Sequence, residues 1–181
     1  MSENKKPSGR RSVRLGAQAP GSTPVQSAAE RRSAEAQVRT LIAKFAPTQL
    51  RLVAAMRRSL RKRLPTAHEV VYEYRSWFVI SFSPSGHGFE GVLAIRGDAD
   101  GVKLYFNRGK ELPDPEKLLQ GSSQTRFIGV EGASTLARPA VAGLIEEAIA
   151  ANRVPFARDG RGSVVIRSTA SKQRPRRRSG K

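Results

Sequence analysis

The sequence predicts an α+β domain in which a curved antiparallel sheet of about five strands packs against helices in two layers. Apolar residues recur at intervals of three and four before residue 65 and again after residue 139, as in amphipathic helices. Between residues 69 and 130 the interval is two, as in strands that bury one face. The links between the strand candidates are short and rich in turn-forming residues, which favours an antiparallel meander over parallel strands joined by helices.

The first predicted helix begins at Ser27, and Glu30 stands where the second half of a capping box is expected. An apolar stripe follows at helical spacing: Val38, Leu41, Ile42 and Phe45. Pro47 interrupts it, and a second helix is predicted from Thr48 to the residue before Pro65. Cations suit the negative end of a helix dipole, and the last turns of this helix carry Arg57, Arg58, Arg61, Lys62 and Arg63.

Five strands are predicted from alternating apolar residues, in segments 69–75, 78–83, 89–96, 101–106 and 125–130. The glycine-rich stretch 83–91 does not have the Walker pattern and is predicted to be a hairpin turn. A third helix begins at Pro139 and ends by Pro155. Residues 163–168 form either a late strand or an ordered extension.

Charge and composition predict one domain, residues 27–157, between a basic tail at 1–26 and a basic extension at 158–181. The 181 residues carry a net charge of +18. Residues 1–32 hold seven Lys or Arg and two Glu, and residues 158–181 hold nine and one. The first 26 residues contain too few apolar side chains to offset the entropy of ordering, so the tails are predicted to be disordered.

The C-terminal tail is a candidate for sequence-independent contact with nucleic-acid phosphates, through Arg174, Arg176, Arg177 and Arg178. The tail has no aromatic residue, so base stacking by the tail is not predicted. The alternative is a tail that only aids solubility.

Cysteine is absent from the sequence, which excludes disulfides, thiolate metal sites and a cysteine nucleophile. No apolar run approaches the roughly 20 residues that span a bilayer. A secretory signal is not predicted either, because no apolar stretch follows the basic N-terminus. We therefore expect a cytoplasmic protein that does not contact a membrane.

Residues 101–121 are predicted to form a strand and then a short helix. Asp114 suits the N-cap of that helix, Pro115 its first position, and Gly121 the position after its end. The polar and basic residues left over lie at adjacent strand ends and are candidates for binding a small anionic ligand: Asn107, Arg108, Lys110 and Arg126. The alternative is that this segment has a purely structural role.

Four blocks of the chain resemble the YdhG-like family, also called domain of unknown function 1801. They are LPTAHEVVYEYRSWFVISFSP, GVKLYFNRGKELPDPEKLLQG, QTRFI and LARPAVAGLIEEAIAANRVPF. The resemblance as a whole covers roughly residues 41–156. The resemblance implies a curved antiparallel sheet backed by helices, as in frataxin. Most members of the family are bacterial, and some are described as frataxin-like iron chaperones. The family supplies no catalytic motif.

We therefore expect a non-enzymatic binding or accessory module without a cofactor, whose partner is a small anionic ligand or a protein. The alternative is an iron-binding protein, for which Glu146 and Glu147 are the only adjacent carboxylates in the sequence. An enzyme has the least support, because no nucleophile, acid and base stand in a recognisable pattern.

Overall fold

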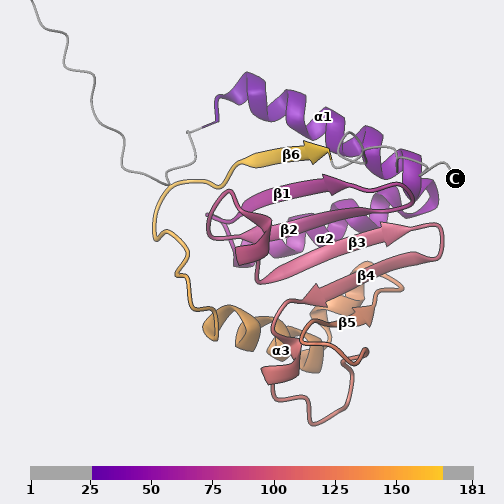
Figure 1. Ribbon diagram of the computed structural model, residues 1–181, viewed down its shortest axis with the longest axis vertical. Coiled ribbons are helices and arrows are strands. Elements are labelled where there is room, and N and C mark those ends of the chain that lie inside the picture. Colours follow the sequence, from indigo (N-terminus) through magenta and orange to yellow (C-terminus); the bar gives the residue numbers. More distant parts are fainter. Residues whose placement is uncertain (1–25, 169–181) are drawn as a thin grey trace, which may run out of the picture.

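The computed structural model describes residues 26–168, which form an α+β fold with three α-helices and a six-stranded mixed sheet (Figure 1). The strand order is β5-β4-β3-β2-β1-β6, and the sheet is not closed. Residues 1–25 and 169–181 lie outside the described part of the chain. The tail candidates Arg174, Arg176, Arg177 and Arg178 are among them.

The three helices follow the sequence prediction closely. Helix α1 spans Ala28–Phe45, and its capping box is formed: the Ser27 hydroxyl accepts from the Glu30 N–H at 3.2 Å, and the Glu30 carboxylate accepts from the Ser27 N–H at 2.7 Å. Helix α2 spans Leu50–Arg63, after a single 3-10 turn at Pro47–Gln49. Helix α3 spans Pro139–Ala150, with Pro139 in the first turn.

Strands β1 to β5 form the predicted antiparallel meander. Their bounds are His68–Glu73, Phe78–Ser83, Leu93–Asp98, Gly101–Phe106 and Arg126–Gly129.

A sixth strand, β6 at Val164–Ser168, pairs in parallel with β1. The late strand that the sequence offers at residues 163–168 is thus confirmed. The predicted antiparallel sheet is correct for β1 to β5, but the sheet has six strands and is mixed, because β6 adds in parallel. After α3 the chain returns to the outer edge of β1, and β6 has no hairpin partner beside it in the sequence that would reveal this pairing.

The first residue of β6 is bonded by the side chain of Gln26. The Gln26 amide donates to the Val164 carbonyl and accepts from the Val164 N–H, both at 3.0 Å. This reciprocal pair imitates one rung of a strand ladder. It ties the start of α1 to the start of β6.

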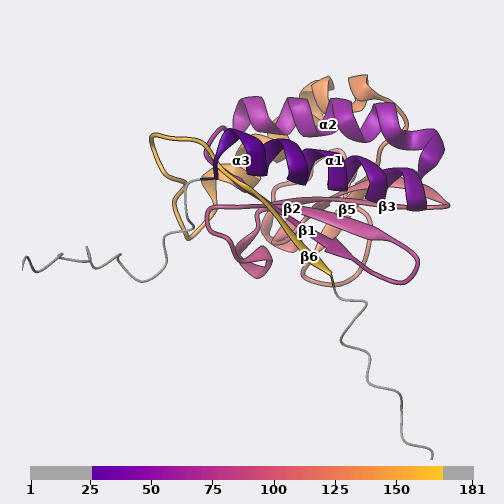
Figure 2. The ribbon, with the colours of Figure 1, turned by 90° about the horizontal axis from the view of Figure 1, so that it is seen from above.

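One row of apolar side chains crosses the whole sheet. In register from β6 to β5, it consists of Ile166, Val71, Ile80, Ile95, Leu104 and Ile128. These residues belong to the hydrophobic core or pack against it, together with the apolar stripes of the helices. Figure 2 shows the helices on one side of the sheet, and the row packs in one core with their apolar stripes.

The short helix predicted at residues 114–121 is wrong. The Lys117 N–H bonds to the Asp114 carbonyl at 3.1 Å and closes a turn, and Lys117 then takes a φ of 53°, which a helix cannot continue. Gln120 forms a bridge with Phe127 instead. Asp114 still caps backbone, since its carboxylate accepts from the N–H groups of Leu118 and Leu119 at 2.9 and 2.8 Å.

The connection from β2 to β3 is longer than the predicted hairpin turn. It includes a 3-10 turn at Gly88–Glu90 and ends at β3, which begins at Leu93. Phe89, which the sequence pattern places at the start of a strand, is 80% exposed in this turn. No helix among residues 26–168 has the length and apolar character that a membrane crossing requires.

Candidate anion-binding cleft

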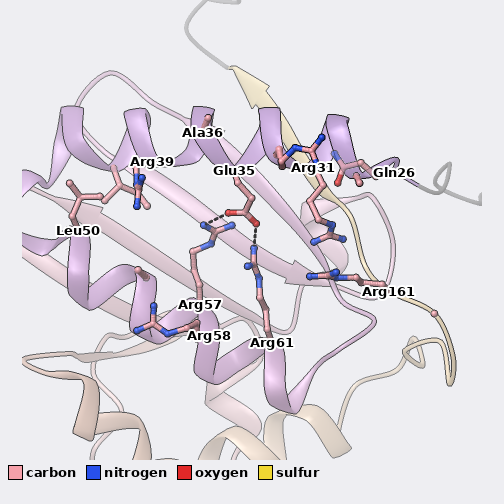
Figure 3. A pocket seen from close by; sticks show the side chains of 15 residues that line it. Gln26, Arg31, Glu35, Ala36, Arg39, Leu50, Arg57, Arg58, Arg61 and Arg161 are labelled. Carbon is pink, nitrogen blue, oxygen red and sulfur yellow. Dashed lines mark hydrogen bonds and ion pairs between the residues drawn. The ribbon is translucent and has the colours of Figure 1, made fainter.

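A cleft of about 1070 Å³ lies between α1, α2 and the loop at residues 160–161 (Figure 3). Its charged lining contains a single acidic residue, Glu35. The other charged residues that line it are seven arginines: Arg31, Arg32, Arg39, Arg57, Arg58, Arg61 and Arg161. The cleft is therefore strongly positive.

Helical spacing explains why these arginines converge. On α1, Arg31, Glu35 and Arg39 follow one another at intervals of four residues, which places them along one side of the helix. On α2, Arg57 and Arg61 have the same separation, so both guanidinium groups can reach the same acceptors. Figure 3 shows these side chains pointing from the two helices into the space between them.

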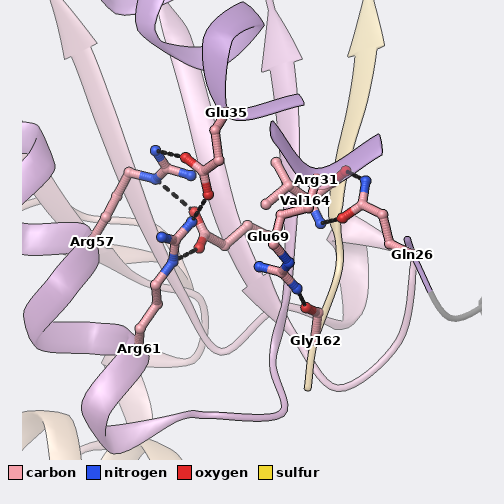
Figure 4. Close-up of polar contacts among 8 residues, drawn as sticks. All are labelled: Gln26, Arg31, Glu35, Arg57, Arg61, Glu69, Gly162 and Val164. Carbon is pink, nitrogen blue, oxygen red and sulfur yellow. Dashed lines mark hydrogen bonds and ion pairs between the residues drawn. The ribbon is translucent and has the colours of Figure 1, made fainter. Parts of the chain in front are cut away.

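Two of the arginines form a buried network with two carboxylates (Figure 4). Arg57 donates from Nε to Glu69 at 2.7 Å and from Nη1 to Glu35 at 3.0 Å. Arg61 donates from Nε to Glu69 and from Nη2 to Glu35. Each carboxylate thus binds both guanidinium groups, and the network joins α1, α2 and β1.

Glu69 enters this network because of its position in β1. It lies on the same face of the strand as Val71, so its carboxylate points towards the helices. The Glu69 side chain is 3% exposed and the Arg57 side chain 8%. Charges buried this deeply are stable only when their partners and hydrogen bonds compensate for lost water, and here each group has at least two charged partners.

The network also shifts the pKa values of its two more exposed members, Glu35 and Arg61. Burial alone would raise the pKa of Glu35, but attraction and hydrogen bonds from Arg57 and Arg61 hold this pKa below its ordinary value. Burial opposes the charged form of Arg61, yet Glu69 and Glu35 raise its pKa overall. Burial and the neighbouring Arg161 and Arg61 lower the pKa of Arg31. Mutual repulsion among the arginines is therefore present at the mouth of the cleft.

The cleft holds more guanidinium donors than the protein itself uses. The Nη2 atom of Arg57 is buried and has no hydrogen-bond partner among the described residues. Arg39, Arg58 and Arg161 are exposed, and within residues 26–168 none of their side chains has a hydrogen-bond or ion-pair partner. The exposed guanidinium groups of Arg39, Arg58 and Arg161 are therefore the donors that an anion in the cleft can reach.

The cleft continues towards the start of β1 as a smaller space of about 390 Å³. Arg31, Arg61 and Arg161 line both spaces. The Arg31 guanidinium donates to the carbonyl of Gly162, which fixes the loop at residues 160–162 beside α1 (Figure 4).

The four residues that the sequence predicts as a ligand site lie at the neighbouring ends of β4 and β5, away from the lining of this cleft. They are Asn107, Arg108, Lys110 and Arg126. Asn107 donates its amide to the Gly91 carbonyl, and Arg108 forms an ion pair with Glu111. Arg126 packs closely against Gly109: a Cβ added to Gly109 would lie 2.4 Å from the Cβ of Arg126. Anion binding by these four residues stays a prediction.

The predicted metal candidates lie on the exposed side of α3. Glu146 forms an ion pair with Arg63 at 3.2 Å, and Glu147 is exposed beside it. Within residues 26–168, no three His, Asp or Glu side chains are placed so that they could hold a metal ion together. His68 instead bonds to Ser163: its Nδ1 lies 2.8 Å from the Ser163 hydroxyl.

Comparisons of this chain with protein-family models, with curated proteins and with solved structures found no match. The assignment to a YdhG-like or frataxin-like family therefore stays a prediction from the sequence.

Sequence reasoning found only part of the cleft. From the sequence, the arginines of α2 are identified only as cations that suit the end of a helix, and their part in a site is not predicted. Arg31, Arg39 and Arg161 are missed, because the approach of α1 to α2 and to the loop at 160–162 is a tertiary contact. The interval of four between Arg31, Glu35 and Arg39 is the one local signal that points to a charged helix face.

Proposed function

We propose that this protein binds a ligand with several negative charges in the cleft between α1 and α2, and that it acts as a binding module. The observation that supports this most directly is the set of exposed arginines lining the cleft, since the side chains of Arg39, Arg58 and Arg161 have no hydrogen-bond or ion-pair partner within residues 26–168. Their charge is not neutralised by Glu35, the one carboxylate in the lining, which pairs with Arg57 and Arg61.

Phosphate groups are the chemistry that fits such a lining. Guanidinium groups bind phosphate oxygens through two parallel hydrogen bonds, and they remain charged at any physiological pH. Arginines reach the cleft from three directions: Arg39 from α1, Arg58 from α2, and Arg161 from the C-terminal loop. A ligand with at least two phosphate groups would engage all three segments at once.

The proposal is compatible with a place in the YdhG-like family and with a frataxin-like arrangement in two layers. The placement in that family is supported by the α+β order of elements and by the four sequence blocks that resemble it. The basic tails are a second proposed source of affinity, for nucleic-acid phosphates without sequence preference. The iron-binding alternative has no additional support from the geometry around Glu146.

Calorimetric titration of the full chain with inorganic pyrophosphate at low ionic strength tests the cleft. The wild type is expected to bind one equivalent saturably. The double variant Arg39→Ala/Arg58→Ala removes two exposed guanidinium groups without disturbing the buried network. It is expected to bind at least about a hundredfold more weakly, because each of the two lost charge-assisted hydrogen bonds contributes about 1.5–3 kcal/mol and about 1.4 kcal/mol is a factor of ten.

Two controls distinguish binding in the cleft from a general effect of removing positive charge. The double variant Arg138→Ala/Arg153→Ala makes the same change in charge at exposed positions near the ends of α3 and is expected to bind pyrophosphate like the wild type. A variant with the four tail arginines changed to Gln is expected to do the same. Absence of saturable binding by the wild type, or equal losses in both double variants, would show that the cleft is not an anion site.

A further inference from the structure

The face of the sheet opposite the helices carries a continuous strip of aromatic and cationic side chains, which we call the aromatic face. Helix α2 lies behind the sheet in Figure 1, so this face is turned towards the viewer. The strip consists of five aromatic residues and two cations, all of them partly exposed: Tyr72, Tyr74, Trp77, Tyr105, Phe127, Arg96 and Lys103.

Strand register places five of these residues on one side of the sheet, while Tyr74 and Trp77 lie in the connection between β1 and β2. Tyr72 of β1 lies opposite Val79 of β2, Val79 opposite Arg96 of β3, and Arg96 opposite Lys103 of β4. One step along the strands, Tyr105 of β4 lies opposite Phe127 of β5. Side chains alternate between the two faces of a strand, so this row and the apolar row of the core point in opposite directions.

At the β1 end, the strip is held together by ring contacts. The ring centroids of Tyr72 and Tyr74 are 6.4 Å apart, and Tyr74 stacks on Trp77 at 5.2 Å. The guanidinium carbon of Arg96 lies 4.6 Å from the Trp77 ring. These contacts order large flat side chains that remain partly exposed at the surface.

The strip continues to the far edge of the sheet through Tyr105. Arg96 lies 3.5 Å from the Tyr105 hydroxyl, and the Tyr105 and Phe127 rings are 5.2 Å apart. The ammonium group of Lys103 lies 5.2 Å from the centroid of the Phe127 ring. Each aromatic cluster therefore has a cation beside it, and the Nε of Arg96 is buried without a partner among the described residues.

The segment between β2 and β3 borders this face. Gly88 lies close to Tyr72: a Cβ added to Gly88 would be 2.4 Å from the Tyr72 hydroxyl oxygen. The adjacent Phe89 is 80% exposed, and its ring lies 5.5 Å from the ring of His87. Arg167 of β6 donates to the Gly86 carbonyl at 3.2 Å, which adds a cation at this border. Asp98, which pairs with Arg96 at 3.4 Å, is the carboxylate within the strip.

From this arrangement we propose that the aromatic face binds single-stranded nucleic acid. Bases stack on flat aromatic rings whatever their sequence, and cations between the rings bind the phosphates that join them. Partly exposed rings on a sheet face are the surface that unpaired bases require, whereas a duplex keeps its bases stacked inside. A polyanionic partner suits the cations of this face, Arg96 and Lys103, and the net charge of +18 of the chain. This site is independent of the cleft, which lies on the helical side.

The only tryptophan of the sequence, Trp77, lies within the proposed site and provides a direct readout. We expect its fluorescence to be quenched saturably when the full chain is titrated with a 15-residue oligothymidylate or oligouridylate. Comparison of the two distinguishes DNA from RNA as the preferred strand. A 15-base-pair DNA duplex is expected to bind without this quenching, through phosphates alone.

Variants test the face with a labelled oligothymidylate and fluorescence anisotropy. Trp77→Leu is expected to weaken binding about tenfold, as the loss of one base–aromatic stack does. Lys103→Gln is expected to weaken binding and to lower the salt dependence of the affinity. Lys62→Gln makes the same change at an exposed position on α2, and its affinity and salt dependence are expected to stay closer to those of the wild type. Circular dichroism checks that each variant is folded.

The Arg39→Ala/Arg58→Ala variant of the cleft is expected to retain the quenching of Trp77. If oligothymidylate binds without quenching Trp77, or if Lys103→Gln and Lys62→Gln weaken binding equally, the aromatic face is not the site. Absence of binding by the wild type would also overturn the proposal. None of these outcomes affects the pyrophosphate test.

Discussion

Nε of Arg57 lies 2.7 Å from a carboxylate oxygen of Glu69, and neither side chain is more than 8% exposed. This ion pair joins α2 to β1 under the helices, at the base of the cleft. The same two residues thus connect the stability of the fold to the charge of the proposed ligand site.

Arg57→Met is expected to destabilise the protein by about 3–5 kcal/mol, because it leaves the buried Glu69 with one cation instead of two. Arg63→Met breaks the exposed pair with Glu146 and is expected to cost less than about 1 kcal/mol. Urea unfolding followed by circular dichroism measures both. Similar losses for the two variants would mean that the buried network does not stabilise the fold more than a surface ion pair.

His68 is expected to make stability depend on pH near neutrality. Burial lowers its pKa from the ordinary value of 6.5, and the Ser163 N–H donates to its Nδ1 at 3.2 Å, which requires that nitrogen to be unprotonated. As the pH falls below 6.5, the unfolded chain takes up the proton first. The stabilisation is therefore present above that value and is lost as the pH falls through the lower folded pKa.

Replacement of His68 by Gln is expected to flatten the dependence of the unfolding free energy on pH between about 7.5 and 5.5. His87, which is exposed in the connection between β2 and β3, provides the matched control. A slope that persists in His68→Gln and disappears in His87→Gln would contradict the assignment.

Two glycines are expected to respond in opposite directions to replacement by alanine. A Cβ on Gly162 would stand 1.8 Å from the Ala67 carbonyl oxygen, so Gly162→Ala must displace the chain beside β1 and is expected to lower the melting temperature strongly. Gly143 lies within α3 with nothing within 4 Å of an added Cβ. Gly143→Ala is expected to stabilise by about 0.5–1 kcal/mol. Thermal unfolding of both variants checks the pair.

The C-terminal tail is expected to contribute phosphate contacts. Changing Arg174, Arg176, Arg177 and Arg178 to Gln should reduce the slope of log affinity against log salt for oligothymidylate by up to about 3, since each contact with a single strand contributes about 0.7. Quenching of Trp77 at saturation should be unchanged. An unaltered slope would show that the tail does not take part in binding.

Local sequence signals predicted the elements of the fold well, because their determinants lie within a few residues of each other. The capping box at Ser27 and Glu30 and the alternating strands from β1 to β5 are examples. The parallel pairing of β6 could not be predicted in this way, since Val164 pairs with Glu69 from a distant part of the chain.

The segment at Asp114 shows a second limit. Its cap signals are correct, since the Asp114 carboxylate does accept backbone N–H groups. The same signals suit a turn as well as a helix, and pairing of Gln120 with Phe127 decides between them. The cleft and the aromatic face were missed for a related reason: each is assembled from elements that meet only after folding.

The late pairing of β6 with β1 has a consequence for synthesis on the ribosome. The outer edge of β1 can pair only after residues 164–168 have been translated. The side chain of Gln26 likewise has no bond to Val164 until then, although it is translated much earlier. Until then a nascent chain exposes an unpaired strand edge, to which another chain can pair. This interval in translation, rather than the finished fold, is where we expect the protein to be most open to misassembly with neighbouring copies.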